Sequence, residues 1–577
     1  MCVFFYKKTR FFPRIDKINN RRKKLRFNVL LSKLIFKKAT VYYLLTNISA
    51  LIYLIYIQGN FANYNLCIVP LAFGRTYNMK RKQLKGIATA IMALLIFIVP
   101  LLSVAATDAD KPVPRIWVHG FMSSQVYEDI SDPNSALAWP PTEEEITTAV
   151  KDSVPAFAEL ALTKDWDHFG KEMGQITGKL FSRAMNNPDG TVKEGSGIRF
   201  EYPAKSKIKA DKDIYFKYDW REDPIKIAAQ LNDFINYVLD ASGCDQVALT
   251  CHSFGGVVAT TYFSIYGCDK VKTVVFNSTA IYGETYTGEL MTGQLIFSGD
   301  ALQNYLFYAF QGNEYEHLIN AAIKAAHDTG LMDILSKGLN GLSAKIQKEV
   351  CSQSIVPLFG GWLSVWAMVP DEYIDEAVNF VFNKIYKDSE TDYSALKAKI
   401  ENYNNLVRRK KTETLKEVNE KCNVYVITRY GYSSLPMTPS ASNLGDGIID
   451  VKYASFGATA SEYGKTLDNI TSDAKYISPD KTVDASTCLF PEQTWFVKNM
   501  KHGSDDAALK NMMRKFMKYD GQATIETFEE YPRFTIFDGE SILPESPIEN
   551  HSTFFDKIRF IVNDIIKLVK AIINKAK

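Results

Sequence analysis

The sequence predicts an α/β protein in which helices flank a mostly parallel central sheet. Short, nearly continuous apolar runs recur along the chain, which is typical of strands buried on both faces. Helical patterns separate these runs, as expected where crossover helices join parallel strands. The expected strands span residues 113–121, 213–220, 245–251, 270–278, 422–431 and 494–499.

The clearest helical pattern is found at residues 223–242. Asp223 and Pro224 open it as a capping residue followed by a first-turn proline. Apolar residues then recur on one stripe, namely Ile225, Ile227, Leu231, Phe234, Ile235 and Val238. The segment 283–420 breaks the alternation of strands and helices. It is helix-like and too long for a connection, so we expect an inserted, mainly helical cap (lid) domain there.

Composition excludes several classes of protein. The 577 residues are 46% hydrophobic and 23% charged, with a net charge of +3, which argues against a basic nucleic-acid-binding protein. The eight cysteines form no CxxC pair and show no Cys/His ligand spacing, so we expect no structural zinc site. Neither a P-loop nor a GxGxxG motif is present, and the chemistry expected below needs no cofactor.

The first hundred residues have the character of a targeting region. From Met79, a basic head, an apolar run at 87–102 and small residues at Ser103 and Ala105 form the layout of a secretory signal peptide. Residues 1–78 precede it and contain an uncharged run at 41–57 that is just long enough to span a bilayer. Either the upstream region is a membrane anchor, or translation starts at Met79. Both alternatives place the body of the chain outside the cytoplasm, where disulfides are permitted. Cys244 and Cys268 precede consecutive strands, and we expect them to pair.

The stretch CHSFG at residues 251–255 predicts a nucleophilic serine. A serine on a tight turn between a strand and a helix needs small neighbours two positions before and after it, as in the G-x-S-x-G nucleophile elbow. Here Ser253 occupies the centre, and Cys251 stands where glycine is usual. Because cysteine is small, we expect the turn to be kept.

Two backbone amides are candidates for an oxyanion hole. In hydrolases with this elbow, one N–H comes from the residue after the nucleophile and the other from the loop after an early strand. The residue after the nucleophile is Phe254, and the early strand ends in His119-Gly120-Phe121. We therefore expect the Phe254 and Phe121 amides to hold the oxyanion.

The chain order serine, acid, histidine then selects the two remaining catalytic residues. His502 follows the strand expected at 494–499, so it is the candidate base. Asp446 lies in a Gly-Asp-Gly turn after the strand expected at 422–431, so it is the preferred acid. Asp450, four residues further on, is the alternative acid.

Several motifs resemble the lecithin–cholesterol acyltransferase and lysosomal phospholipase group of α/β-hydrolases. YDWR at 218–221 precedes the elbow by a similar interval, GGWLSVWAMVPDEY at 360–373 resembles a stretch of the cap, and GDGIIDVKYAS at 445–455 resembles the acid motif. The resemblance spans roughly residues 113–510. It implies an α/β-hydrolase fold and a lipase or esterase. The alternatives are an O-acyltransferase or phospholipase of this type and, third, a non-catalytic lipid-binding protein.

Other features favour a lipid ester as substrate. Trp362 and Trp366 lie in an apolar run of the cap, where we expect them to be exposed and, with His119, to contact substrate. Residues 554–577 form a basic amphipathic pattern suited to an anionic membrane surface or to docking on the body. The expected organisation is 1–78 upstream region, 79–106 signal peptide, 107–282 and 421–535 hydrolase core, 283–420 cap, and 536–577 linker and basic helix.

Overall fold

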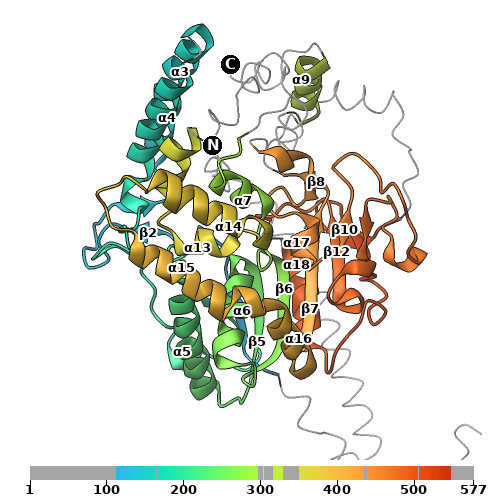
Figure 1. Ribbon diagram of the computed structural model, residues 1–577. Coiled ribbons are helices and arrows are strands. Elements are labelled where there is room, and N and C mark those ends of the chain that lie inside the picture. The colour runs from blue at the N-terminus through green and yellow to red at the C-terminus, as the bar shows by residue number, and fades with distance from the viewer. Residues whose placement is uncertain are drawn as a thin grey trace, which may run out of the picture. The chain divides into compact units, whose positions relative to one another are not determined.

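The computed structural model describes residues 112–546 except 164, 296–302, 304–315, 329–347, 349, 435–437 and 505. An eight-stranded sheet forms its centre (Figure 1). All neighbouring strands are parallel except the last pair, β13 and β14. The spatial order is β14 (Ile542–Pro544), β13 (Phe534–Phe537), β12 (Thr494–Lys498), β7 (Asn423–Tyr430), β6 (Val271–Thr279), β5 (Val247–Ser253), β1 (Arg115–Val118) and β4 (Asp213–Phe216).

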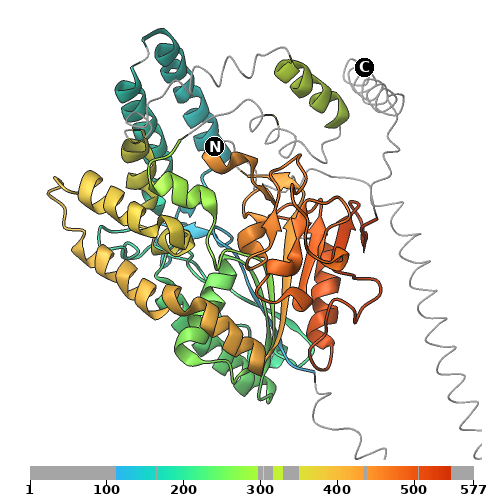
Figure 2. The same ribbon diagram turned by 45° about the vertical axis from the view of Figure 1, so that its right-hand side comes forward.

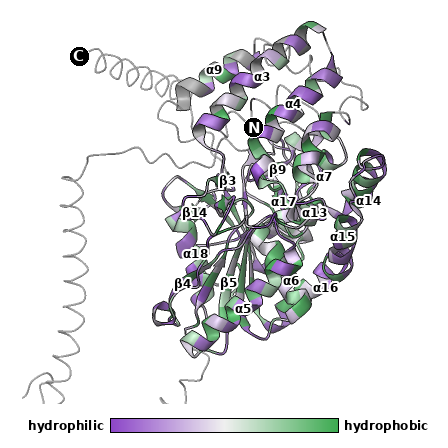
Figure 3. Cartoon of the chain, turned by 90° about the vertical axis from the view of Figure 1, so that its left-hand side faces the viewer, coloured by the Kyte–Doolittle hydropathy of each residue, from purple (hydrophilic) through white to green (hydrophobic). Residues whose placement is uncertain are grey.

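The sheet is buried on both faces, because its side chains point alternately into apolar clusters, of which a third lies at β7, β12 and β13. In β5, Leu249 belongs to the larger core and Ala248 to the smaller one. Helices α5 (Pro224–Ser242) and α6 (Phe254–Tyr266) contribute to the larger core, and α18 (Ala507–Lys518) contributes to the smaller. In Figure 3, α18 lies on one side of the strands, with α5 and α6 on the other. The predicted fold class, a mostly parallel sheet flanked by helices, is therefore confirmed.

Local sequence sets the ends of α5. The Asp223 side chain accepts a hydrogen bond from the backbone N–H of Ile225 at 2.9 Å, and Pro224 occupies the first turn. Gly243 ends the helix at φ 68°, a left-handed conformation that favours glycine. The apolar stripe expected from the sequence faces the core, where Leu231, Phe234 and Val238 are fully buried.

The segment expected to be a cap packs in part directly on the core. Helices α13 (Leu363–Met368) and α16 (Lys411–Lys421) both contact α6. Figure 2 shows these yellow and orange helices beside the green ones. The segment also contains α7 (Thr285–Met291), α9 (Glu316–Asp328), α12 (Val356–Phe359), α14 (Asp371–Phe380), α15 (Ser394–Leu406) and the π-helical turns Cys351–Ile355 and Val381–Ile385. Its separate movement as a lid stays a prediction.

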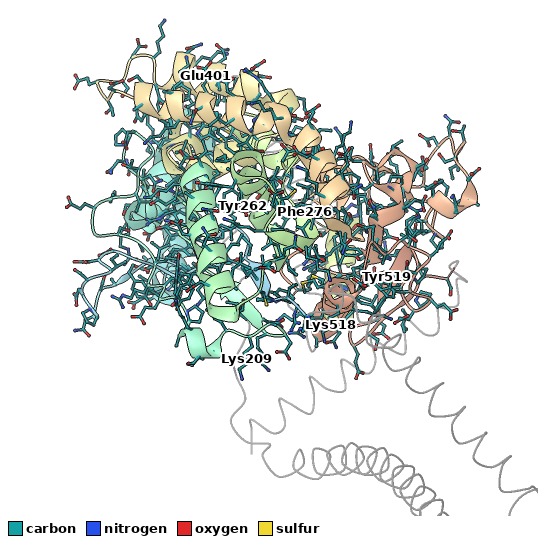
Figure 4. The ribbon with its side chains drawn as sticks, turned by 90° about the horizontal axis from the view of Figure 1, so that it is seen from below. Lys209, Tyr262, Phe276, Glu401, Lys518 and Tyr519 are labelled. Carbon is teal, nitrogen blue, oxygen red and sulfur yellow. The ribbon has the colours of Figure 1, made fainter. Side chains whose placement is uncertain are left out.

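The view from below separates interior from surface. Tyr262 of α6 and Phe276 of β6 are buried, whereas Glu401 on α15 and Lys518 and Tyr519 at the end of α18 are exposed (Figure 4). The remaining helices and small two-stranded sheets surround the strand ends. They are α3 (Glu143–Thr163), α4 (Trp166–Phe181), α17 (Val451–Ala454), β2 (Val126–Tyr127) with β3 (Leu137–Trp139), β8 (Tyr432–Ser433) with β9 (Leu444–Gly445), and β10 (Thr459–Ala460) with β11 (Val483–Asp484). Short 3₁₀ turns span Ser182–Ala184, Lys205–Lys207, Arg408–Lys410, Pro439–Ser442, Ala474–Tyr476, Ala485–Thr487 and Pro491–Gln493.

Sequence expectations about the two ends of the chain and about its thiols have different outcomes. The expected signal peptide and the basic C-terminal helix lie outside the described residues. Strands β13 and β14 were not predicted, and they extend the sheet beyond residue 535. The expected Cys244–Cys268 disulfide is wrong, since all six cysteines of the described residues are free. Cys268 instead points into the core beside Cys422, whose thiol donates to the backbone carbonyl of Cys268 at 3.7 Å.

Candidate active site

The candidate nucleophile lies at the turn from β5 to α6. Ser253 has φ 56° and ψ −126°, a backbone conformation that residues other than glycine rarely adopt. The residue is 7% exposed. The turn is the strand-to-helix geometry that the CHSFG stretch predicts. Cys251 is fully buried in the larger core, and burial raises the pKa of its thiol. Its sulfur therefore stays a neutral core group.

The glycines after the serine allow α6 to approach the sheet. A Cβ atom at Gly255 would lie 2.5 Å from the backbone oxygen of Val118 in β1, and one at Gly256 would lie 2.4 Å from the Cβ of Thr279 in β6. Both contacts are shorter than side chains tolerate. Glycine at these two positions is thus required for the serine turn to rest over the end of the sheet.

The loop that follows β1 lies against the serine. A Cβ at Gly120 would be 2.8 Å from the Cβ of Ser253, so the backbone of this loop passes directly beside the candidate nucleophile. The rings of Phe121 and Phe254 lie 6.2 Å apart. Phe254 is the first residue of α6, where helix amides have no partner within the helix and the helix dipole is positive. The structure thus brings together the two residues whose amides the sequence assigned to the oxyanion hole.

A buried aspartate holds the candidate base. Asp446 Oδ2 lies 2.7 Å from His502 Nδ1, and the Asp446 side chain is fully buried. Asp446 Oδ1 accepts the backbone N–H groups of Ile448 at 3.1 Å and Ile449 at 2.8 Å, which fixes the carboxylate. Gly447, at φ 93°, makes the tight turn between them possible.

The base lies close to the serine turn. The ring of His252, the residue before Ser253, is 4.7 Å from the ring of His502. Burial, followed by the Arg429 charge, holds the pKa of His252 well below its usual value. His252 is therefore neutral at neutral pH, and no second imidazolium opposes a charged His502.

Asp450, the alternative acid, has other partners. Its Oδ2 accepts hydrogen bonds from Asn443 Nδ2 at 3.0 Å and from the Thr285 hydroxyl. Burial raises the pKa of its carboxyl group to about 6. The geometry thus pairs Asp446, and not Asp450, with the histidine.

The YDWR segment fastens the loop beside the serine. The Tyr218 hydroxyl donates to the backbone carbonyl of His119 at 2.5 Å, and the Trp220 indole donates to the carbonyl of Ser124 at 3.1 Å. Asp219 and Arg221 form a buried ion pair at 2.7 Å that closes the segment on itself. The motif therefore supports residues 119–124 at both ends. The sequence predicted its importance by resemblance, but it did not predict this contact.

His119 is engaged with the protein in this structure. Its Nδ1 lies 2.8 Å from the carbonyl oxygen of Gly120 and its Nε2 lies 2.9 Å from Ser124 Oγ, while its ring stacks on Tyr218 at 4.2 Å. Burial lowers its pKa to about 4, so the ring is neutral. These contacts give His119 a place in the loop framework and do not support the expected contact with substrate.

The expectation that two tryptophans of the cap are exposed is wrong. Trp362 is 0% and Trp366 is 1% exposed. Their indole N–H groups donate to the carbonyls of Ala184 at 3.1 Å and Gly360 at 2.8 Å. Trp362 also packs edge-on against Trp220 at 5.1 Å and Phe121 at 6.0 Å. Trp362 therefore packs against the loop that follows β1. Its burial is favourable because removing a large apolar ring from water lowers the free energy of the folded state.

Comparison with known proteins supports the fold class. Residues 202–319, which include the serine turn, match a family model described as alpha/beta hydrolase fold. No curated protein and no solved structure matches the chain. With the parallel sheet, this match establishes an α/β-hydrolase fold and supports hydrolase activity in general. It provides no evidence specific to the lecithin–cholesterol acyltransferase group.

The described residues contain neither a metal-binding cluster nor a membrane-spanning helix. Within the described ranges, no group of three or more His, Cys, Asp or Glu side chains is arranged to hold a metal ion. None of the helices in that same part of the chain is long and apolar enough to cross a bilayer.

Proposed function

We propose that this protein is a serine hydrolase that cleaves carboxylic esters. The observation that carries the proposal is the Asp446–His502 hydrogen bond of 2.7 Å beside a strained serine at a strand-to-helix turn. A serine hydroxyl is a weak nucleophile until a neighbouring base removes its proton. The arrangement of the acid, the base and the serine turn supplies the groups that such activation needs.

The proposed reaction proceeds through an acyl-enzyme. His502 takes the hydroxyl proton of Ser253 as the oxygen attacks the ester carbonyl, while Asp446 orients the imidazole and stabilises its charge. The amides of Phe121 and Phe254 stabilise the oxyanion. His502 then protonates the departing alcohol, and water releases the acyl group by the same steps in reverse order.

The proposed substrates are esters of lipids. This rests on the resemblance at YDWR and in the acid motif, since the two tryptophans that suggested a lipid surface are buried. If an alcohol replaced water in the second step, the product would be a transferred acyl group. A panel of short- and long-chain esters, with and without an acceptor alcohol, distinguishes these outcomes.

Substitutions test the catalytic assignment. Ser253→Ala and His502→Ala are expected to abolish ester hydrolysis in a protein that stays folded, and Asp446→Asn to lower kcat on the order of 10⁴-fold. Asp450→Asn is the matched control and is expected to have a small effect on kcat, because Asp450 bonds Asn443 and Thr285. Full activity of Ser253→Ala would contradict the enzyme proposal, and a larger loss in Asp450→Asn would contradict the choice of acid.

A further inference from the structure

A buried arginine, Arg429, lies between strand β6 and the loop that carries His502. Arg429 is the penultimate residue of β7 and is 2% exposed. Strand β7 lies between β6 and β12 in the sheet, and His502 follows β12. The side chain can therefore reach both neighbouring strand ends at the carboxyl edge of the sheet.

The guanidinium of Arg429 binds the backbone of the histidine loop. Its Nη1 lies 3.0 Å from the carbonyl oxygen of Lys501, 2.5 Å from that of His502 and 3.1 Å from that of Ser504. Three carbonyls of one loop thus converge on a single donor group. Within the loop, the Lys501 carbonyl also accepts the backbone N–H of Ser504 at 3.1 Å. Because the loop is neither helix nor strand, a side-chain donor such as Arg429 adds to the hydrogen bonds that its carbonyls accept.

The other side of the arginine is fixed to β6. Arg429 Nε donates to Asn277 Oδ1 at 3.1 Å, and the backbone N–H of Arg429 donates to Ser278 Oγ at 3.0 Å. The backbone carbonyl of Asn277 also lies 3.0 Å from Nδ1 of His252, the residue before the serine. Arg429 and Asn277 therefore connect the strand end beside the serine turn to the histidine loop.

The histidine is then held at three points. Its ring binds Asp446, its backbone N–H donates to the Asp446 carbonyl at 3.0 Å, and its own carbonyl accepts from Arg429. The first two contacts come from the acid turn, and the third comes from β7. A bond from this second element restricts movement of the histidine loop about the acid turn.

We propose that Arg429 is a positioning residue that sets the placement of His502 relative to Ser253. This inference rests on the proposed function for its kinetic consequences. A guanidinium suits the role because its planar, permanently charged donors bind several oxygens in a fixed geometry, which a lysine ammonium cannot reproduce. The chemical step is sensitive to such placement, since a shift of about 1 Å can cost on the order of 100-fold in rate.

The test compares three full-length variants. Arg429→Met removes the donors at similar length, and Arg429→Lys keeps the charge without the planar fork. Arg533→Met is the matched control, because Arg533 is 3% exposed and donates to the backbone carbonyl of Pro491, away from the histidine loop. For each variant, kcat and KM on one ester are measured, together with the downfield proton NMR signal of the imidazole N–H donated to Asp446.

Loss of the Arg429 contacts should affect kcat much more than KM. Arg429→Met should lower kcat about 100-fold, change KM less than about threefold and broaden or remove the downfield signal. Arg429→Lys should recover part of kcat, and Arg533→Met should keep both kcat and the signal. A kcat of Arg429→Met within threefold of wild type would overturn the proposal, as would an equal loss in Arg533→Met.

Failure of the Arg429 proposal can be distinguished from misfolding of a variant and from failure of the proposed function. If Arg429→Met fails to fold, Arg429→Lys carries the test, and wild-type kcat together with a wild-type signal in that variant would overturn the proposed need for a planar donor. If wild-type protein hydrolyses no ester and a fluorophosphonate probe does not label Ser253, the proposed function fails. The NMR signal then still decides whether Arg429 holds His502 against Asp446.

Discussion

At the residue scale, Glu284 is a buried carboxyl group close to the acid turn. It is 3% exposed, and its oxygen accepts a hydrogen bond from the Thr287 hydroxyl. Burial, reinforced by the nearby charges of Asp450 and Asp446, raises its pKa from 4.5 to about 8. The folded protein thus retains this proton through a pH range in which the unfolded chain releases it.

This difference predicts a pH-dependent stability. Because the folded pKa is the higher one, the contribution of Glu284 is fully present below pH 4.5 and is lost as the pH rises toward 8. Between pH 5 and pH 8, wild-type protein should lose on the order of 3 kcal/mol relative to Glu284→Gln. Urea unfolding at both pH values measures this, with Glu417→Gln on the surface of α16 as control. A wild-type-minus-variant difference that stays constant with pH would contradict the assignment.

At the element scale, the YDWR segment and the loop after β1 behave as one unit. The loop has its carbonyls at His119 and Ser124 bound by Tyr218 and Trp220, and Trp362 packs behind it. A loop fixed at both ends keeps an amide in place without help from substrate, which is the preorganisation that electrostatic stabilisation requires.

Loss of the hydrogen bond from Tyr218 to the loop should lower kcat. Tyr218→Phe deletes the hydroxyl that donates to His119 and leaves a buried carbonyl without that donor, at a cost of about 1–3 kcal/mol. With the loop loosened, kcat should fall at least about 10-fold. Tyr237→Phe is the matched control, since the Tyr237 hydroxyl donates to the carbonyl of Pro203 at 2.9 Å, remote from the loop. Equal kcat losses in both variants would show that the defect is not local.

A feature could be predicted from the sequence when the residues that form it lie close together along the chain. Six strands and the serine turn depend on local patterns, namely apolar runs and small residues at fixed spacing, so they were predicted near their observed positions. The turn that carries Asp446 was also predicted from a local pattern, Gly-Asp-Gly. The burial of Trp362, the role of Tyr218 and the reach of Arg429 depend on segments more than 70 residues apart, and no spacing rule reports such contacts.

At the scale of the whole molecule, the larger core is continuous across the predicted boundary of the cap. One cluster of buried side chains contains Leu231 and Val257 from α5 and α6 together with Trp366 and Val418 from α13 and α16. Cys351, in the π-helical turn before α12, belongs to this same cluster. Segments that share one apolar core tend to unfold cooperatively. We therefore expect the described part of 283–420 to unfold together with the sheet.

The buried thiols make this expectation measurable. Five of the six described cysteines are buried, at positions 251, 268, 351, 422 and 488, and burial raises the pKa of each thiol, so the reactive thiolate forms only after opening. Labelling with a thiol reagent in increasing urea, read per cysteine by peptide mass spectrometry, should give Cys351 the same rate and urea dependence as Cys251 and Cys422. Cys244, which is half-buried, should react first and serves as the internal control. Faster labelling of Cys351 at low urea would show instead that residues around α12 open independently, as a lid does.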